Sequence, residues 1–289
     1  MRKRKYLSNR DLLAEIHKSK NKYSSYLEEE HGQYDIILPS LDKVNIRTTA
    51  EAKRNHADRT GRDNYEAAYM RGEKVKQAEF LIDWKKIKKT DVIFRIMTFD
   101  HIPLQPGRKK TLKTVADHHT QCNFPPYQHW KFDDDNPDEL ICVGKSHWEG
   151  GLQNGHFSKT HADMTPKLAR MFMKLVERYA SRSNWRGYTY NDEMQGAGLL
   201  QLSRIGLQFD ESKSDNPFAY YTAAVTNSFT RVLNLEKKGQ RIRDDILEHN
   251  GLNPSYTRQS ENQDKMKALA DLDKLTPPKV TTIEVKQKK

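Results

Sequence analysis

The chain has 289 residues, of which 35% are hydrophobic, and a formal net charge of +11. This length suits one large domain or two smaller ones, and the positive charge favours an anionic partner, most commonly nucleic acid. Two cysteines are too few for a disulfide framework, and no apolar run is long enough for a signal peptide or a transmembrane helix. These features exclude small disulfide-rich secreted proteins and predict a cytoplasmic protein without a membrane partner.

Residues 1–33 are predicted to form an N-terminal helix that follows a basic tip. Ser8 or Asn9 can cap this helix, and Leu12 and Ile16 lie on a narrow apolar stripe. A helix with so little apolar surface must dock on another part of the chain.

Residues 34–156 are predicted to form a small α+β module. The segment YDIILPSL and residues 91–99 have the composition of short strands. Between them, residues 48–89 are charged and helix-prone, and Gly61 and Gly72 are expected to break them into pieces.

This module also contains a weak candidate for metal binding. Four side chains could hold a structural zinc, namely His119, Cys122, Cys142 and His147. The spacings between these four residues are irregular, and the two cysteines do not form a C-x-x-C pair. The alternative is two small buried thiols and several surface histidines, and we predict no metal or cofactor.

Residues 157–252 are predicted to be a helical domain. Thr165 can cap its first helix, with Pro166 at the first position. The apolar stripe of that helix consists of Leu168, Met171, Phe172, Leu175, Val176 and Tyr179. A second helix is predicted from Asn191 to Phe209, followed by a polar link.

A third helix is predicted from Asp215 to Lys238, with Asp215 as its cap. One face is apolar and carries Phe218, Tyr221, Val225, Phe229 and Val232, while the opposite face carries Tyr220, Ala224, Asn227, Arg231, Asn234 and Lys238. A tyrosine ring can stack on a base, an amide can read a base edge, and cations can hold phosphates. The alternative is the solvated face of an ordinary amphipathic helix.

After Gly239 we predict one more short helix, which Gly251 ends. Residues 253–289 are predicted to be a flexible tail, with a short helix near residues 266–275.

Residues 168–238 carry a resemblance to a known family. Their sequence is LARMFMKLVERYASRSNWRGYTYNDEMQGAGLLQLSRIGLQFDESKSDNPFAYYTAAVTNSFTRVLNLEKK. This stretch resembles the second region of bacterial RNA polymerase sigma factors of the sigma-70 family, especially the late-transcription sigma factors of large myophages, including those that infect cyanobacteria. The opening YLSNRDLLAEI is also similar to the start of those phage factors. The resemblance implies a mainly α fold: a three-to-four-helix bundle with an inserted small α+β module and a disordered tail.

The resemblance also implies partners and residue roles in the host bacterial cytoplasm. The middle helix would dock on the largest-subunit clamp coiled coil of host core RNA polymerase through Asp192, Glu193, Gln195 and Gln201. The next helix would recognise and melt an A/T-rich minus-ten promoter element and hold the non-template single strand. Its implied DNA-binding residues are Tyr220, Tyr221, Asn227, Thr230, Arg231, Asn234, Lys237 and Lys238. Tyr220 matches the position at which the family traps a flipped adenine.

The chain also departs from the family pattern. Ala223 and Ala224 replace the tryptophan pair of primary sigma factors, so strand separation would use Tyr220 and Tyr221 or need help from the polymerase. No minus-thirty-five contact is expected, and the need for a sliding clamp or a phage co-activator is left open.

The expected role is not enzymatic, but two other classes of function stay open. One is an RNA-binding or ribosome-associated basic module. The other is a metal-dependent nuclease that uses His118, His119, Cys122 and His147. The nuclease hypothesis lacks converging carboxylates, because the acids of residues 133–135 are consecutive and fit a solvated turn better.

Overall fold

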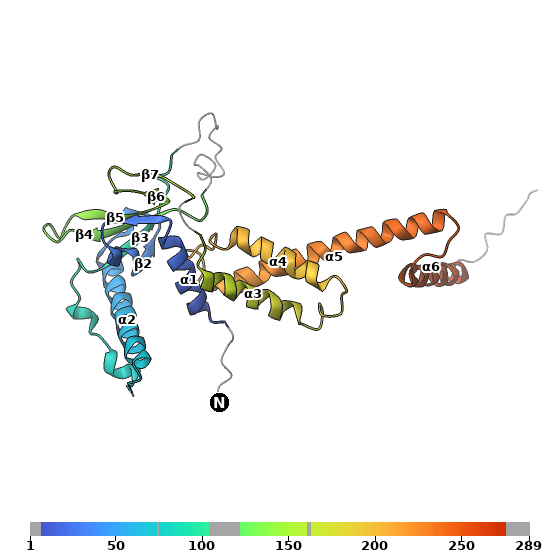
Figure 1. Cartoon of the computed structure of the whole chain (residues 1–289), viewed down its shortest axis with the longest axis horizontal. Helices are drawn as coiled ribbons and strands as arrows, with labels where there is room; N and C mark the ends of the chain where they lie inside the picture. Colours follow the sequence, from blue (N-terminus) through green and yellow to red (C-terminus); the bar gives the residue numbers. More distant parts are fainter. Residues whose placement is uncertain (1–6, 74, 104–121, 161–162, 276–289) are drawn as a thin grey trace, which may run out of the picture. The chain divides into compact units, whose positions relative to one another are not determined.

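The computed structural model describes residues 7–73, 75–103, 122–160 and 163–275 (Figure 1). The chain divides into two compact units, residues 1–228 and residues 229–289. The α-helices are α1 (Asn9–Asn21), α2 (Ile46–Met70), α3 (Pro166–Ala180), α4 (Asn191–Ile205), α5 (Pro217–His249) and α6 (Tyr256–Leu275). The strands are β1 (Ser24–Tyr26), β2 (Ile36–Leu38), β3 (Ile93–Met97), β4 (Tyr127–Phe132), β5 (Leu140–Ser146), β6 (Trp148–Glu149) and β7 (His156–Phe157). Short 3-10 helices are η1 (Glu29–Gly32), η2 (Leu41–Lys43), η3 (Gln77–Phe80) and η4 (Trp84–Lys86).

The first unit contains a five-stranded sheet with the strand order β1-β5-β4-β3-β2. Its pairs are antiparallel except for β2 and β3, which are parallel, and the register of β4 and β5 shifts between His129 and Trp130. Strand β1 comes from the N-terminal segment, and its Ser25 pairs with Lys145 of β5. Residues 1–33 therefore contribute a strand to the sheet as well as helix α1.

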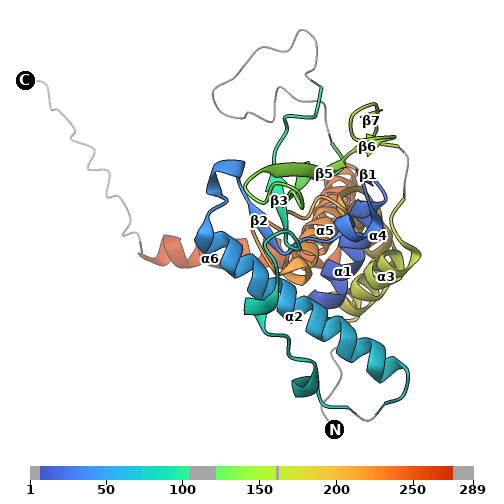
Figure 2. The same ribbon diagram turned by 90° about the vertical axis from the view of Figure 1, so that its left-hand side faces the viewer.

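Helix α2 packs against the sheet, as Figure 2 shows. Ala52 of α2 is fully buried in an apolar cluster with Leu38, Val92, Phe94 and Ile96. The predicted break at Gly61 is wrong, because α2 runs through this position. Gly72 follows Arg71, the C-cap of α2, and has a φ of 83°. A side chain at residue 61 would collide with the main chain of Phe80 in η3, so Gly61 permits close packing inside the helix.

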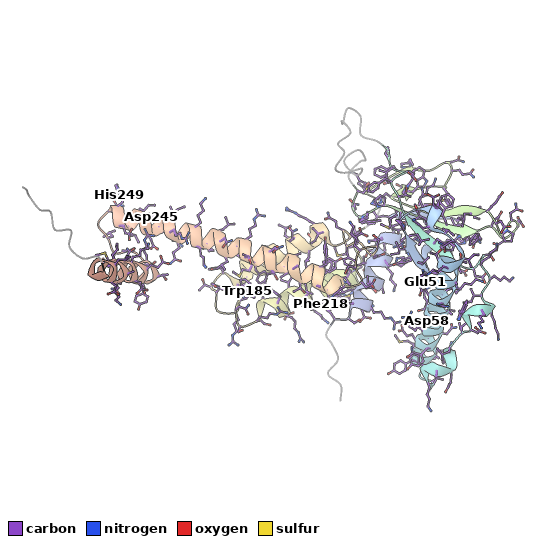
Figure 3. The ribbon with its side chains drawn as sticks, turned by 180° about the vertical axis from the view of Figure 1, so that it is seen from behind. Glu51, Asp58, Trp185, Phe218, Asp245 and His249 are labelled. Atoms are coloured by element: carbon purple, nitrogen blue, oxygen red, sulfur yellow. The ribbon has the colours of Figure 1, made fainter. Side chains whose placement is uncertain are left out.

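The helical part of the first unit follows the predicted pattern closely. Ser8 caps α1, Thr165 caps α3 by accepting from the Leu168 N–H, and the whole predicted stripe of α3 is buried. Helix α1 docks at the start of α3, where the Ser19 hydroxyl accepts from the Thr165 N–H at 3.1 Å. The side-chain amide of Asn191 closes the connection to α4 by donating to the carbonyl oxygen of Trp185, which Figure 3 labels, at 2.9 Å.

Helix α5 differs from the prediction at both ends. It begins at Pro217, and the side chain of Asn216, not of Asp215, accepts the N–H of Ala219 at 3.0 Å. It also continues through Gly239 as far as His249, so the separate short helix predicted there is wrong. Gly251, with a φ of 70°, follows its end as predicted.

Helix α6 replaces part of the predicted flexible tail. It spans 20 residues, whereas the sequence predicted only a short helix at its C-terminal end. The second unit fixes its start through Ser255, whose N–H and hydroxyl both donate to Asp244 at 2.8 Å. Arg258 adds hydrogen bonds to Asp245 and Glu248, and Figure 3 labels Asp245 near the end of α5. These contacts with α5 explain why a polar segment is helical here.

Among the described residues, no helix is both long enough and apolar enough to cross a membrane.

Candidate nucleic-acid interface

Tyr220 lies at the exposed edge of the helical part of the first unit. It is 37% exposed, and its ring stands edge-on to Phe209 at a centroid distance of 5.5 Å and to Tyr221 at 5.2 Å. Both supporting rings are buried. Partial burial raises the pKa of Tyr220, so its hydroxyl is protonated at neutral pH. The two buried rings thus hold the partly exposed ring of Tyr220 in a fixed position.

Tyr221 belongs to the core and not to the exposed face. Its side chain is fully buried, and its hydroxyl donates to the carbonyl oxygen of Gly206 at 2.6 Å. In this conformation its ring is not accessible to a base. The sequence placed it both on the apolar face and among the DNA-binding residues, and the structure supports only the first assignment.

Asn227 lies two helical turns after Tyr220 and is exposed. The neighbouring Thr226 fixes this part of α5 through a 2.7 Å hydrogen bond with the hydroxyl of Tyr179 in α3. Ala223 is exposed and Ala224 is half-buried, so neither provides an aromatic surface. In the first unit, the predicted interface therefore consists of Tyr220 and Asn227.

The remaining predicted DNA-binding residues lie in the second unit, on the continuation of α5. Thr230, Arg231, Asn234, Lys237 and Lys238 are all exposed. Within the described part of the chain, none of these five side chains forms an ion pair or a hydrogen bond. Their charges and polar groups are therefore available to a partner.

The sequence did not predict the extension of this basic stretch beyond Gly239. Arg241 is exposed and lies three residues after Lys238 and four after Lys237, so the three cations lie on one side of the helix. The predicted break hid this relationship. The available signal was that no proline or helix-capping residue stands beside Gly239, so one isolated glycine need not end the helix.

The proposed polymerase-binding residues do not share one face of α4. Asp192 and Glu193 are exposed in the first turn, where acids also complement the helix dipole. Gln195 is half-buried and donates to Asn191 at 2.8 Å. At 3.6 residues per turn, Gln201 lies about 120° around the helix from Gln195. The two acids thus form the open surface, and the two amides lie at its edges.

Of the predicted zinc ligands, His119 lies outside the described residues, as does His118 of the alternative nuclease site. Burial raises the pKa of Cys122 to about 11, which opposes the thiolate form that zinc requires, and the thiol of Cys142 lies 3.5 Å from the carbonyl oxygen of Gly144. His147 packs on Phe124 at a ring distance of 4.0 Å. Within the described ranges, no three or more histidine, cysteine or acidic side chains are arranged to hold a metal ion.

Comparison with protein-family models, with curated proteins and with solved structures found no match to this chain.

Proposed function

We propose that this protein is a sigma-type transcription initiation factor, which joins a bacterial core RNA polymerase to promoter DNA through α4 and α5. The observation that carries the proposal is the position of Tyr220, a partly exposed ring that the buried rings of Phe209 and Tyr221 support at the start of α5. A resemblance in sequence order and spacing to the sigma-70 family and its phage late-transcription members supports the same role.

The DNA contact would combine stacking with charge. A base extruded from an A/T-rich duplex would stack on Tyr220, which contributes about 1–3 kcal/mol per base and offsets unstacking. Arg231, Lys237 and Lys238 are exposed and would neutralise phosphates of the opened non-template strand. Asn227, Thr230 and Asn234 add donors and acceptors for base edges or sugar oxygens.

The polymerase contact would use the acidic start of α4. Asp192 and Glu193 are exposed and suit a basic surface such as the clamp coiled coil of the largest polymerase subunit. Each rim contact contributes about 1 kcal/mol or less, so affinity must be shared over a larger interface. This role would be exercised in the cytoplasm of a host bacterium, with or without a phage co-activator.

Run-off transcription tests the proposal. Core RNA polymerase, ideally cyanobacterial, is mixed with the protein and a supercoiled template that carries a TATAAATA-like element. We expect accurate initiation that Tyr220→Ala abolishes and Tyr220→Phe retains, with polymerase binding unchanged in both. Tyr69→Ala is the matched control, because Tyr69 is an exposed tyrosine on α2 and should leave initiation unchanged.

Two results separate the proposal from its alternatives. Replacing Arg231 and Lys238 by alanine should weaken DNA binding and reduce the salt slope of affinity by about 2. If the wild-type protein neither binds polymerase nor initiates, the proposal is wrong. Tight RNA binding without polymerase would then support an RNA-binding module.

A further inference from the structure

A buried group of charged and aromatic side chains joins the sheet to the connection between α4 and α5. Arg95 of β3 is 1% exposed, and its Nη1 lies 2.5 Å from Oε2 of Glu211 in that connection. The other carboxylate oxygen of Glu211 lies 3.1 Å from Nζ of Lys20 in α1. The hydroxyl of Tyr34 also donates to Glu211 at 3.1 Å. Three side chains from different parts of the first unit, Arg95, Lys20 and Tyr34, thus contact the two carboxylate oxygens of Glu211.

The environment of Arg95 fixes its direction. Its guanidinium lies between the rings of Tyr34 and Tyr127, 3.8 and 3.9 Å from their centroids. Its Nε donates to Nε2 of His129 at 3.0 Å, and the other ring nitrogen of His129 lies 2.6 Å from the carbonyl oxygen of His31. Burial keeps the pKa of His129 far below its usual value, so the ring is neutral and accepts from Arg95. The guanidinium therefore has one well-defined orientation.

The carboxylate of Glu211 is ionised in this environment. Burial alone would raise its pKa, but Lys20 and Arg95 lower it to about 2. A buried ion group of this kind is weak evidence for stability, because desolvation opposes the attraction between the charges. Its geometric effect is clearer, because it restrains a connection that is otherwise largely exposed.

The same group reaches the ring of Tyr220 in one further step. Nζ of Lys20 donates to the carbonyl oxygen of Phe209 at 2.8 Å, two residues before Glu211. The side chain of Phe209 is 2% exposed and supports Tyr220 edge-on. Lys20 therefore holds both the carbonyl of Phe209 and the carboxylate of Glu211, on either side of Asp210.

We infer that Arg95, Lys20 and Glu211 are positioning residues, through which the sheet of the first unit sets the place of Phe209 and hence the orientation of Tyr220. The sheet then helps to orient the ring of Tyr220 and is not an independent module. The consequence for base stacking rests on the proposed function, but the positioning itself does not.

Hydrogen exchange of the whole chain, followed by mass spectrometry, tests the positioning without DNA. Glu211→Gln removes the charge that both cations contact. We expect amides of residues 207–221 to exchange about tenfold faster or more, while those of α3 keep their protection. Lys213→Ala is the control, because Lys213 lies in the same connection but pairs only with Asp210 among the described residues.

A milder variant keeps the test decisive if Glu211→Gln does not fold. Tyr34→Phe removes one hydrogen bond to Glu211 and leaves the ring over Arg95 in place. It should accelerate exchange over residues 207–221 to a smaller extent. Unchanged exchange there in a folded variant would overturn the inference. Equal acceleration in α3 would also overturn it, since the group would then only stabilise the whole unit.

The effect on function is tested with polymerase and a promoter that carries 2-aminopurine in the minus-ten element. Glu211→Gln should reduce unstacking about tenfold, whereas Lys213→Ala should leave it unchanged. Equal losses in the two variants would contradict action through the position of Tyr220. If exchange changes as expected but the wild-type protein opens no promoter, the positioning stands and the proposed function fails.

Discussion

The hydroxyl of Tyr221 donates a 2.6 Å hydrogen bond to the carbonyl oxygen of Gly206, which directly follows α4. The bond ties the start of α5 to the end of α4 at a crowded point. A side chain at residue 206 would lie 2.6 Å from the terminal methyl of Met164 and 2.9 Å from the ring of Phe172. Two adjacent tyrosines thus have different roles: Tyr221 joins helices in the core, and Tyr220 faces outward.

Removing the buried hydroxyl should be costly. Tyr221→Phe leaves the Gly206 carbonyl without this partner, so we expect a loss of about 1–3 kcal/mol in the free energy of unfolding, measured by urea denaturation. Tyr220→Phe is the matched control and should change stability by about 0.5 kcal/mol or less, because the Tyr220 hydroxyl makes no hydrogen bond within the described residues and its side chain is partly exposed. Equal effects in the two variants would contradict the division of roles.

The ionised state of Glu211 should make stability depend on acid. Its pKa is about 2 in the folded protein, against the ordinary glutamate value of 4.5 in the unfolded chain. Because the folded value is the lower one, this contribution is complete above pH 4.5 and is lost as the pH falls toward 2. The difference corresponds to at most about 3 kcal/mol. Denaturation between pH 5 and pH 2.5 should show a shallower dependence for Glu211→Gln than for wild type.

His17 should make the free energy of unfolding depend on pH over a higher range than Glu211 does. Burial and the nearby Arg95 lower its pKa from 6.5 to about 3, so the folded protein keeps it neutral. The unfolded chain binds a proton first, and stability should fall as the pH decreases from 6.5 toward 3. His17→Gln should reduce this slope in the same denaturation series. An unchanged slope between pH 6.5 and 5 would exclude His17 as a contributor.

Local sequence patterns predicted helices α1 and α3 of the first unit well. The caps of α1 and α3 and the apolar stripe of α3 follow from spacing that acts within a few residues. The same rules failed at Gly239. The free-energy cost of one glycine inside a helix is small, and α5 continues through it over 33 residues. Spacing along α4 also did not separate Gln195 and Gln201 from the two acids. Only the buried side of the helix, seen in the structure, places these two amides at opposite edges of its exposed surface.

Long-range contacts lie beyond such rules. Arg95 and Glu211 are separated by 116 positions, and each belongs to a segment whose local pattern predicts only a strand or a polar link. Their pairing depends on how the sheet and the helices pack. The helical start of the tail was missed for a related reason, since Asp244 and Ser255 meet only when the chain turns at Gly251.

The start of α6 should depend on Ser255. Its hydroxyl oxygen accepts from the N–H of Arg258, and its own N–H and O–H are held by Asp244. Ser255→Ala should weaken the cap by about 1 kcal/mol, which corresponds to about fivefold faster exchange of the first amides of α6. Ser260→Ala lies inside the same helix and should leave exchange equal or slower, because alanine is the better helix former. Faster exchange in both variants would show that the cap is not specific.

Replacement of glycine by alanine should have opposite effects on the free energy of unfolding at Gly61 and at Gly196, which both lie inside helices. A Cβ at residue 61 would collide with the carbonyl oxygen of Phe80, and main chain cannot move aside as a flexible side chain can. Gly61→Ala should therefore lower the free energy of unfolding, although alanine favours a helix by about 1 kcal/mol. A Cβ at Gly196 in α4 meets nothing within 4 Å, so Gly196→Ala should raise stability by up to about 1 kcal/mol. Thermal or urea unfolding of both variants measures the signs directly. Stabilisation by Gly61→Ala would mean that α2 and η3 do not pack as closely as described.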